Sequence, residues 1–434
     1  PDLYPNVDWI NSIFKKATSN VRANVNVSGG TNVVKYYVSG GFYNENGLFK
    51  TDPTLAYDTG MFYRKFNFRS NVDVKIARYT KMNVNIATTF EQKNQGGTSS
   101  SDIWKYALVT PSCAYPMIYS TGQYPGQSGG AAGANPYALV TQTGYRQTFY
   151  NNAQSVFTLS HDFAWLTNGL TANIKASFDA NNVHSQNRTR TPEVYINPWR
   201  DSDGNLHLTQ FKEGSQTLSF ATAATGWRAI YFEANVNYAR SFGLHSVGAL
   251  LLYQQSEKNY VGNSATTSQA ALPYRHQGLA FRTTYNYDSR YFIEFNAGYN
   301  GSENFSPGHR FGFFPSVAAG WMVSNEKFWD PVKKVISQLK FKGSYGLVGN
   351  DQIGGSRRFI YLETIDAGGS YIFGASPVSY SSYRLGEYPN ENVGWETAKK
   401  LDLGFDIKFF NALSFQFDYF HAWLVSNVID STYY

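Results

Sequence analysis

Residues 290–329 read RYFIEFNAGYNGSENFSPGHRFGFFPSVAAGWMVSNEKFW, and their first part alternates between two kinds of side chain. Between Tyr291 and Tyr299 the odd positions are aromatic or aliphatic, whereas the even positions include Glu294 and Asn296. A period of two is typical of a β-strand with one apolar and one polar face. Residues 339–345 repeat the pattern, so we predict further strands of the same kind.

The same two-faced pattern recurs along all 434 residues. We predict about fourteen strands of about 10 to 16 residues, longer than the roughly 5 to 6 usual in soluble sheets. In the clearest of them, one face carries Phe66, Phe68, Val72, Val74 and Ile76, and the other carries Lys65, Asn67, Arg69, Asn71, Asp73 and Lys75.

The predicted connections alternate in length along the chain. Short turns are expected near residues 30, 79, 168, 243, 289 and 411, and long connections near residues 52, 120, 205, 266, 307 and 373. Outer-membrane barrels have short periplasmic turns and longer extracellular loops. We therefore predict an all-β fold, a transmembrane antiparallel β-barrel. The alternative is a soluble propeller or sandwich, which would leave such long aromatic faces poorly covered.

Three short helices are also predicted. The pattern of Trp9, Ile13 and Phe14 is helical, and residues 102–110 form a second helical segment in a long connection. Asp330-Pro331 has the N-cap and first-turn residues of a third helix. The long connections near 205 and 373 are expected to span residues 185–226 and 350–396.

The composition excludes some classes of protein. Aromatic residues make up 17% of the chain, and no apolar run is long enough for a transmembrane helix. The single cysteine, Cys113, excludes an internal disulfide. The net charge of +6 is modest for this length. It favours ordinary solubility, with affinity for an anionic membrane surface or anionic solute as the alternative. No nucleic-acid partner is predicted.

Short motifs spread along the chain resemble those of the SusC/RagA-type TonB-dependent transporters, in the order that the family has them. They are Val7-Asp8-Trp9 with Ile13-Phe14, Val27-Ser28-Gly29-Gly30, residues 37–42 with Asn46-Gly47, residues 287–291 with Asn300-Gly301-Ser302, Phe314-Pro315-Ser316-Val317 with Gly320-Trp321 and Glu326-Lys327-Phe328, Ser344-Tyr345-Gly346 with Gly349-Asn350, and Pro389-Asn390 with Trp395-Glu396-Thr397. One departure is Asn300, where the family often has an acidic residue before the glycine.

The resemblance implies a 22-stranded outer-membrane barrel of a Gram-negative bacterium, embedded in outer-membrane lipid. It implies an N-terminal plug, a TonB box that couples import to the proton-motive force, and a SusD-like surface lipoprotein that closes over the mouth. It allows a dimer of transporter–lipoprotein pairs. The sequence opens at Pro1, so we expect residues 1–434 to be part of one barrel domain, with the plug and the terminal strands outside it.

No catalytic or cofactor-binding constellation is evident. The seven histidines have no zinc-type spacing, and the adjacent His161 and Asp162 would point to opposite faces of a strand. Residues 201–205 (Asp-Ser-Asp-Gly-Asn) resemble the start of a calcium loop, but Lys212 occupies the position of its essential glutamate, which favours a hairpin turn. Gly-rich residues 126–133 lack the lysine of a phosphate loop. No catalytic residue, metal site or cofactor is predicted.

The candidate ligand or lid contacts are side chains of the long connections, because aromatic faces stack on sugars and peptides. They are Trp104, Tyr115, Tyr119, Tyr124, Trp199 and Arg200. Packing among the loops themselves is the competing explanation for each. The sequence thus predicts active import of an oligosaccharide or oligopeptide. The alternatives are a passive porin and, less favoured, an outer-membrane barrel enzyme.

Overall fold

The computed structural model describes residues 2–127, 135–262, 269, 271–352, 358–386 and 388–426. Its main feature is one antiparallel sheet of 14 strands, and the predicted all-β fold is confirmed. The strands follow sequence order, with the hairpins β7–β8 and β15–β16 outside the sheet. Each strand is therefore hydrogen-bonded to its neighbours in the sheet, and β1 and β18 form the two edges.

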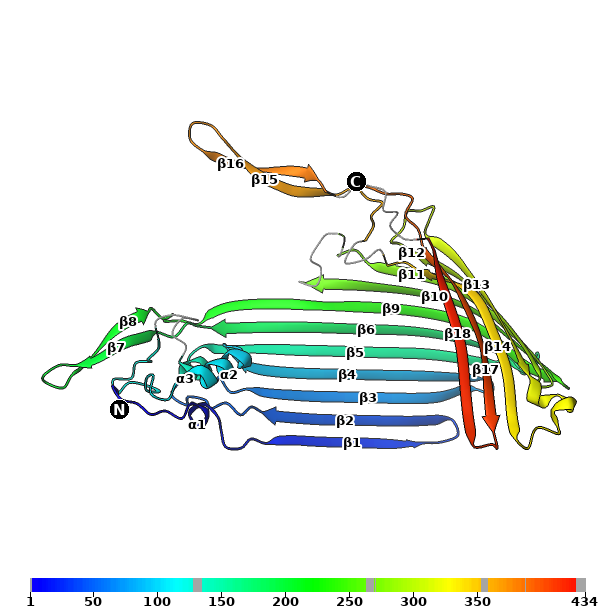
Figure 1. The fold of residues 1–434 in the computed structure, drawn as a ribbon, viewed down its shortest axis with the longest axis horizontal. Helices are drawn as coiled ribbons and strands as arrows, with labels where there is room; N and C mark the ends of the chain where they lie inside the picture. The colour runs from blue at the N-terminus through cyan, green and yellow to red at the C-terminus, as the bar shows by residue number, and fades with distance from the viewer. Residues whose placement is uncertain are drawn as a thin grey trace.

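The strands of the sheet are β1 (Asn20–Gly30), β2 (Val34–Asn46), β3 (Phe62–Ala77), β4 (Thr80–Gly96), β5 (Gly144–Asp162), β6 (Leu170–Thr189), β9 (Ser219–Phe242), β10 (His245–Gly262), β11 (Tyr274–Tyr287), β12 (Tyr291–Ser302), β13 (Phe311–Met322), β14 (Ile336–Asn350), β17 (Glu396–Phe409) and β18 (Leu413–Ser426). Figure 1 shows β1 to β6 and β9 lying side by side, and the sheet curving away through β10 to β14, β17 and β18.

The register aligns the two predicted faces from strand to strand. Phe295 pairs with Val317, and Val317 pairs with Tyr345 on the next strand. All three side chains are exposed, and we call this the apolar face. The opposite polar face carries Glu294, which pairs with Arg282 at 2.9 Å. An apolar outer surface backed by ion-paired polar side chains is the arrangement of a membrane barrel wall.

The short turns bring the strands together at one end. Asp288 and Ser289 both have positive φ, as do Phe410 and Asn411, which gives two-residue turns whose twist matches that of the strands. Gly169, with φ +89°, starts β6 so close to β9 that an added Cβ would lie 2.0 Å from the carbonyl oxygen of Ala239. Only glycine fits this position.

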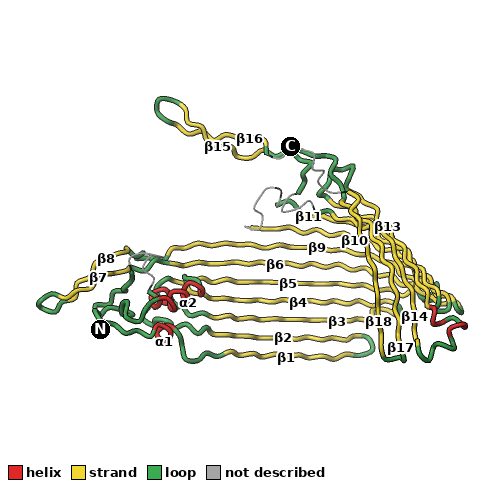
Figure 2. Tube along the Cα trace, viewed as in Figure 1, coloured by secondary structure: helices red, strands yellow, loops and turns green. Residues whose placement is uncertain are grey.

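The long connections lie at the other end and carry structure of their own (Figure 1 and Figure 2). They contain α2 (Ser100–Val109), α3 (Pro136–Thr141) and the hairpins β7 (Val194–Arg200) with β8 (Leu206–Lys212) and β15 (Ile365–Phe373) with β16 (Val378–Leu385). A further helix, α1 (Trp9–Ile13), lies in the N-terminal segment before β1. Asp8, Ser99 and Asn135 cap the three helices with side-chain oxygens. No helix within the described ranges is both long and apolar enough to cross a membrane.

Two sequence-based expectations need correction. The helix expected to begin at Asp330 is wrong, because residues 331–335 form successive turns with hydrogen bonds to the third residue back, such as Val335 to Val332. Two single 3₁₀ turns precede them, at Val323–Asn325 and Lys327–Trp329. The long connection expected at 185–226 is shorter, because β6 and β9 pair as far as Thr189 and Ser219. The expectations also missed α3 and both hairpins.

Candidate functional site

The tightest packing described lies in the connections rather than in the sheet. Ile13, Ile103 and Val140, from α1, α2 and α3, are at most 3% exposed, and Phe49 from the β2–β3 connection joins them. We call the assembly of residues 2–19, 47–61, 97–143 and β7–β8 the loop cluster; 128–134 of it lie outside the described residues. The cluster has its own small hydrophobic core, which holds its surface residues in place.

Aromatic contacts join the N-terminal segment to the connection between β4 and β5. The Phe14 ring lies 4.5 Å from that of Trp104, and the Trp9 ring meets the edge of Tyr115 at 5.4 Å. The indole nitrogen of Trp9 donates to the carbonyl oxygen of Pro111, and the backbone nitrogen of Val7 donates to that of Ser112. Segments about a hundred residues apart therefore form one unit.

A buried carboxylate ties the β7–β8 hairpin to the same unit. Asp2, 4% exposed, accepts hydrogen bonds from the backbone and hydroxyl of Ser120 at 2.9 and 2.8 Å and from the Arg200 guanidinium at 2.6 Å. Burial alone would raise the pKa of Asp2, but these donors outweigh it and keep the pKa below its ordinary value. The arrangement anchors the hairpin at Arg200, the last residue of β7 before the turn.

The predicted contact residues divide by exposure. Trp104 and Trp199 are 45% and 55% exposed, and the Trp199 ring stacks on His207 at 4.3 Å. Tyr115 and Tyr119 are buried, and burial raises the pKa of Tyr119 to about 12. The two tryptophans have free surface for a ligand or a partner, whereas the two tyrosines act in this structure through packing.

Tyr124 is half-buried, and burial raises its pKa to about 12. It borders a cavity of about 130 Å³ between the root of the β7–β8 hairpin and the β4–β5 connection. Arg190, in the same wall, donates through Nε to the carbonyl oxygen of Gln142 at 2.9 Å. The buried side-chain oxygen of Gln123 has no hydrogen-bond partner in the described structure, so it can accept one from a small polar group.

Residues 201–205 form the turn of the β7–β8 hairpin. The Asp201 carboxylate accepts hydrogen bonds from the backbone of Asp203 and Asn205 and from the His207 ring. The His207 contact and the Asn205 bonds hold the pKa of Asp201 well below its ordinary value. Gly204 has φ +86°, as such a turn requires. Across the described ranges, no group of three metal-ligating side chains comes together.

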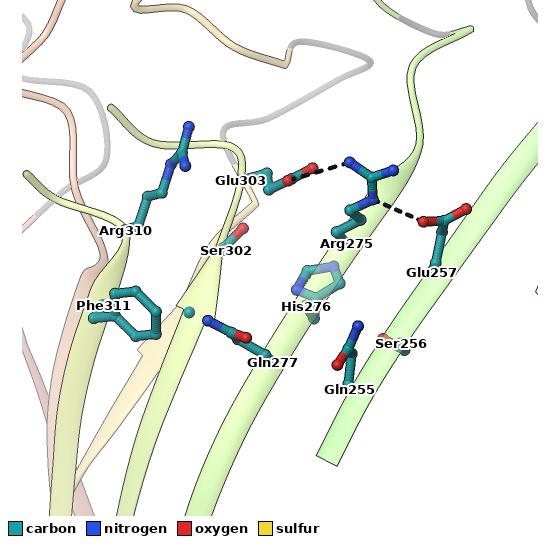
Figure 3. Close-up of a pocket in the computed structure, with 11 residues that line it drawn as sticks. Gln255, Ser256, Glu257, Arg275, His276, Gln277, Ser302, Glu303, Arg310 and Phe311 are labelled. Carbon is teal, nitrogen blue, oxygen red and sulfur yellow. Dashed lines mark hydrogen bonds and ion pairs between the residues drawn. The ribbon is translucent and has the colours of Figure 1, made fainter. Parts of the chain in front are cut away.

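A second polar site lies where the long connections leave β10 to β13. A cavity of about 180 Å³ is bordered by Arg275, Glu257 and Glu303 (Figure 3). Arg275 bridges the two carboxylates, at 2.7 Å to Glu257 and 3.7 Å to Glu303. Phe311 closes one side by lying over Gly301, where any Cβ would meet its ring at 2.5 Å.

Sequence reasoning missed Asp2, Ser120 and Arg358 as determinants of this end of the molecule. Arg358 donates to the carbonyl oxygens of Leu272 and Pro273, both at 2.8 Å, and so joins two further connections. Each contact spans more than eighty residues of sequence. No local pattern signals such a pairing, so the sequence held no cue for it.

No protein-family model matches the chain. Among curated proteins, TonB-dependent receptor P3 of Formosa agariphila is 27% identical over 455 residues, covering 96% of this chain and 41% of the relative. TonB-dependent receptor SusC of Bacteroides thetaiotaomicron is 23% identical over 445 residues, covering 94% of this chain and 41% of the relative. The chain thus spans about two fifths of the length of the curated relatives it matches.

Among solved structures, the RagAB peptide importer in the open-open state superposes with a TM-score of 0.65 at 17% identity, over 96% of this chain and 46% of that one. The long two-faced strands and this superposition show the fold of a β-barrel wall. The curated relatives confirm the resemblance that the motifs indicated: the chain is related to the SusC/RagA-type TonB-dependent receptors over nearly its whole length.

Proposed function

We propose that residues 1–434 form part of the barrel domain of a TonB-dependent importer in the outer membrane of a Gram-negative bacterium. The observation that carries the proposal is the difference between the surface of the sheet and the packing of the long connections. The sheet presents an exposed apolar face suited to lipid, whereas the long connections at one end pack into a preformed loop cluster. A rigid barrel that displays structured loops at its mouth suits capture of a solute from outside.

The cargo in this proposal is an oligosaccharide or an oligopeptide. Trp104 and Trp199 offer exposed indole faces, which stack equally well on sugar rings and on peptide side chains. One structural relative, RagAB, is a peptide importer, and its likeness to this chain supports the fold. Tyr115, Tyr119, Tyr124 and Arg200 hold the tryptophan-bearing segments in place.

The proposed partners are a SusD-like surface lipoprotein, which would close over the loop cluster, and TonB, which would act through a region outside this sequence. Transport by this route requires no covalent catalysis, because the work comes from coupling to the inner membrane. The relatives are named as receptors, which supports a transporter rather than an enzyme.

The test is affinity capture of the full-length protein from detergent-solubilised outer membranes, followed by mass spectrometry of proteins and small molecules. We expect a SusD-like lipoprotein and a bound glycan or peptide to be recovered. Trp104→Ala with Trp199→Ala should reduce that recovery severalfold. Trp165→Ala is the matched control, because Trp165 is 62% exposed but lies in the short turn between β5 and β6.

A passive porin is the rival function, since it would share the same strands. It predicts a barrel that purifies without lipoprotein or cargo, with recovery unaffected by the tryptophan substitutions. That outcome would replace the importer proposal with the porin.

A further inference from the structure

The charged residues of the apolar face are distributed unevenly between its two ends. Side-chain alternation and register place a small set of basic residues on this face in the described strands. Near the long connections these are Arg64, Arg188, Arg228, Arg275 and Lys399, and near the short turns there is Arg240.

Four of these cations lie at the edge of the exposed apolar surface. Going toward the short turns on the same face, Arg64 is followed by Phe66 and Phe68, and Arg228 by Ile230 and Phe232, all of them exposed. Lys399 is followed in the same way by Leu401 and Leu403. We call Arg64, Arg228, Arg275 and Lys399 the cation edge; all four side chains are exposed.

The geometry at the cation edge leaves charge available for a ligand. Arg275 is engaged by Glu257 and Glu303, yet its side chain remains 51% exposed (Figure 3). The Arg64 guanidinium lies 4.3 Å from the centre of the Phe62 ring, which supports it from one side. The two carboxylates that bind Arg275 offset only part of the charge of the four cations. The cation edge therefore keeps an excess of positive charge.

The other end of the apolar face is built differently. It carries exposed aromatic side chains, among them Tyr36, Tyr285, Tyr291 and Trp321. Its basic residue, Arg240, donates to the Thr167 hydroxyl at 3.1 Å and lies 4.7 Å from the Phe242 ring. Tyrosine and tryptophan favour a membrane interface of any charge, whereas exposed arginines beside an apolar belt favour anionic head groups.

We propose that the cation edge binds the phosphate groups of a phosphorylated glycolipid in the outer leaflet. A guanidinium group can donate two parallel hydrogen bonds to one phosphate group. The apolar residues just beyond Arg64, Arg228 and Lys399 accommodate the acyl chains of the same lipid. The proposal deepens the proposed function, because it takes the long connections to be on the outer side of the membrane. Lipid bound at the cation edge would fix the position of the barrel and of its loop cluster relative to the membrane surface.

The test uses the purified full-length protein in mixed detergent micelles, with lipid A as the phosphorylated probe and its dephosphorylated form as comparison. Native mass spectrometry counts bound lipid. We expect lipid A to bind the wild type, and Arg64→Gln/Arg228→Gln/Arg275→Gln/Lys399→Gln to lose binding by tenfold or more. Arg240→Gln should bind as the wild type does, and heat-modifiable electrophoretic mobility should show all variants folded.

The single substitution Arg228→Gln should still lower binding severalfold, so the test holds if the quadruple variant does not fold. Equal binding of lipid A and its dephosphorylated form would overturn the proposal, as would binding by the quadruple variant and by Arg228→Gln that equals binding by the wild type. Displacement of lipid A by an equal concentration of inorganic phosphate would assign the edge to free phosphate instead. Because cargo and lipoprotein play no part in this assay, failure of the importer proposal would show only in the affinity capture.

Discussion

Arg358 lies with its guanidinium 3.4 Å from the centre of the Tyr274 ring, although 84 positions separate the two residues in sequence. The same guanidinium donates to the carbonyl oxygens of Gln269, Leu272 and Pro273, and Arg358 is 7% exposed. Burial lowers the pKa of Arg358, but five donors and the aromatic face compensate for its desolvation. One side chain thus joins the β10–β11 connection to the β14–β17 connection.

Replacing Arg358 by alanine should loosen these connections without unfolding the barrel. Three carbonyl oxygens would lose their donor, at a cost of about 1–3 kcal/mol for each one that water cannot reach. Hydrogen exchange of residues 269–276 should rise, while exchange in β12 and β13 stays unchanged. Arg384→Ala, at an exposed position on β16, is the control. An equal rise in exchange of the same residues in this control would contradict the role assigned to Arg358.

The Asp2 carboxylate should make the attachment of the β7–β8 hairpin dependent on pH. Its folded pKa lies below the ordinary value of 3.8, so its contribution is present above that value and is lost as the pH falls through the folded pKa. Asp2→Asn should raise proteolytic nicking of the hairpin at pH 7, by weakening the contact by about 1–3 kcal/mol. The difference between the variant and the wild type should shrink as the pH falls through the folded pKa of Asp2. A difference that persists in acid would rule out this ionised contact.

Introducing a charge at two adjacent residues of β13 should destabilise the protein to very different extents. Val317 is 47% exposed on the apolar face, whereas Ala318 pairs across the polar face with Glu294. Val317→Arg should destabilise the folded protein in lipid vesicles by about 2–4 kcal/mol, because its guanidinium would enter hydrocarbon. Ala318→Arg should cost far less. Urea unfolding in vesicles measures both, and equal losses would mean that the faces are assigned wrongly.

Lys342 should contribute to the stability of the folded protein through ion pairs on the polar face. Its ammonium group lies 3.1 Å from Asp406 and 2.8 Å from Asp418, on two neighbouring strands. Lys342→Met leaves two carboxylates facing each other and should lower the free energy of unfolding by about 1 kcal/mol or more. Lys400→Met is the control, since Lys400 makes no ion pair within the described ranges. Loss of the difference in high salt would confirm its electrostatic origin.

Much of the sheet could be predicted because each strand carries its own evidence. The alternation in residues 291–299 sets which side chains share a face, and the turns at 288–289 and 410–411 are local events. The helix expected at Asp330 shows the limit of that evidence. Its N-cap and proline are helix signals, but residues 331–335 form successive turns that lead into the strand beginning at Ile336.

The candidate site was predicted only in outline. Aromatic residues in the long connections could be recognised from the sequence as candidate contacts. The sequence does not show, however, that Trp104 is exposed and Tyr115 is buried. Tyr115 is 5% exposed because Trp9 packs against it, whereas Trp104, which meets Phe14, stays 45% exposed. A contact across a hundred residues has no periodicity to reveal it.

By itself, then, the sequence determined the strands, their two faces and the alternation of short and long connections, because the period of two and the turn residues act over a few neighbouring positions. Only the tertiary structure decided which loop residues are buried, that Asp2 meets Ser120 and Arg200, and that Arg64, Arg228, Arg275 and Lys399 lie along one edge. Those relationships depend on strand register and on packing between distant segments, which no local pattern specifies.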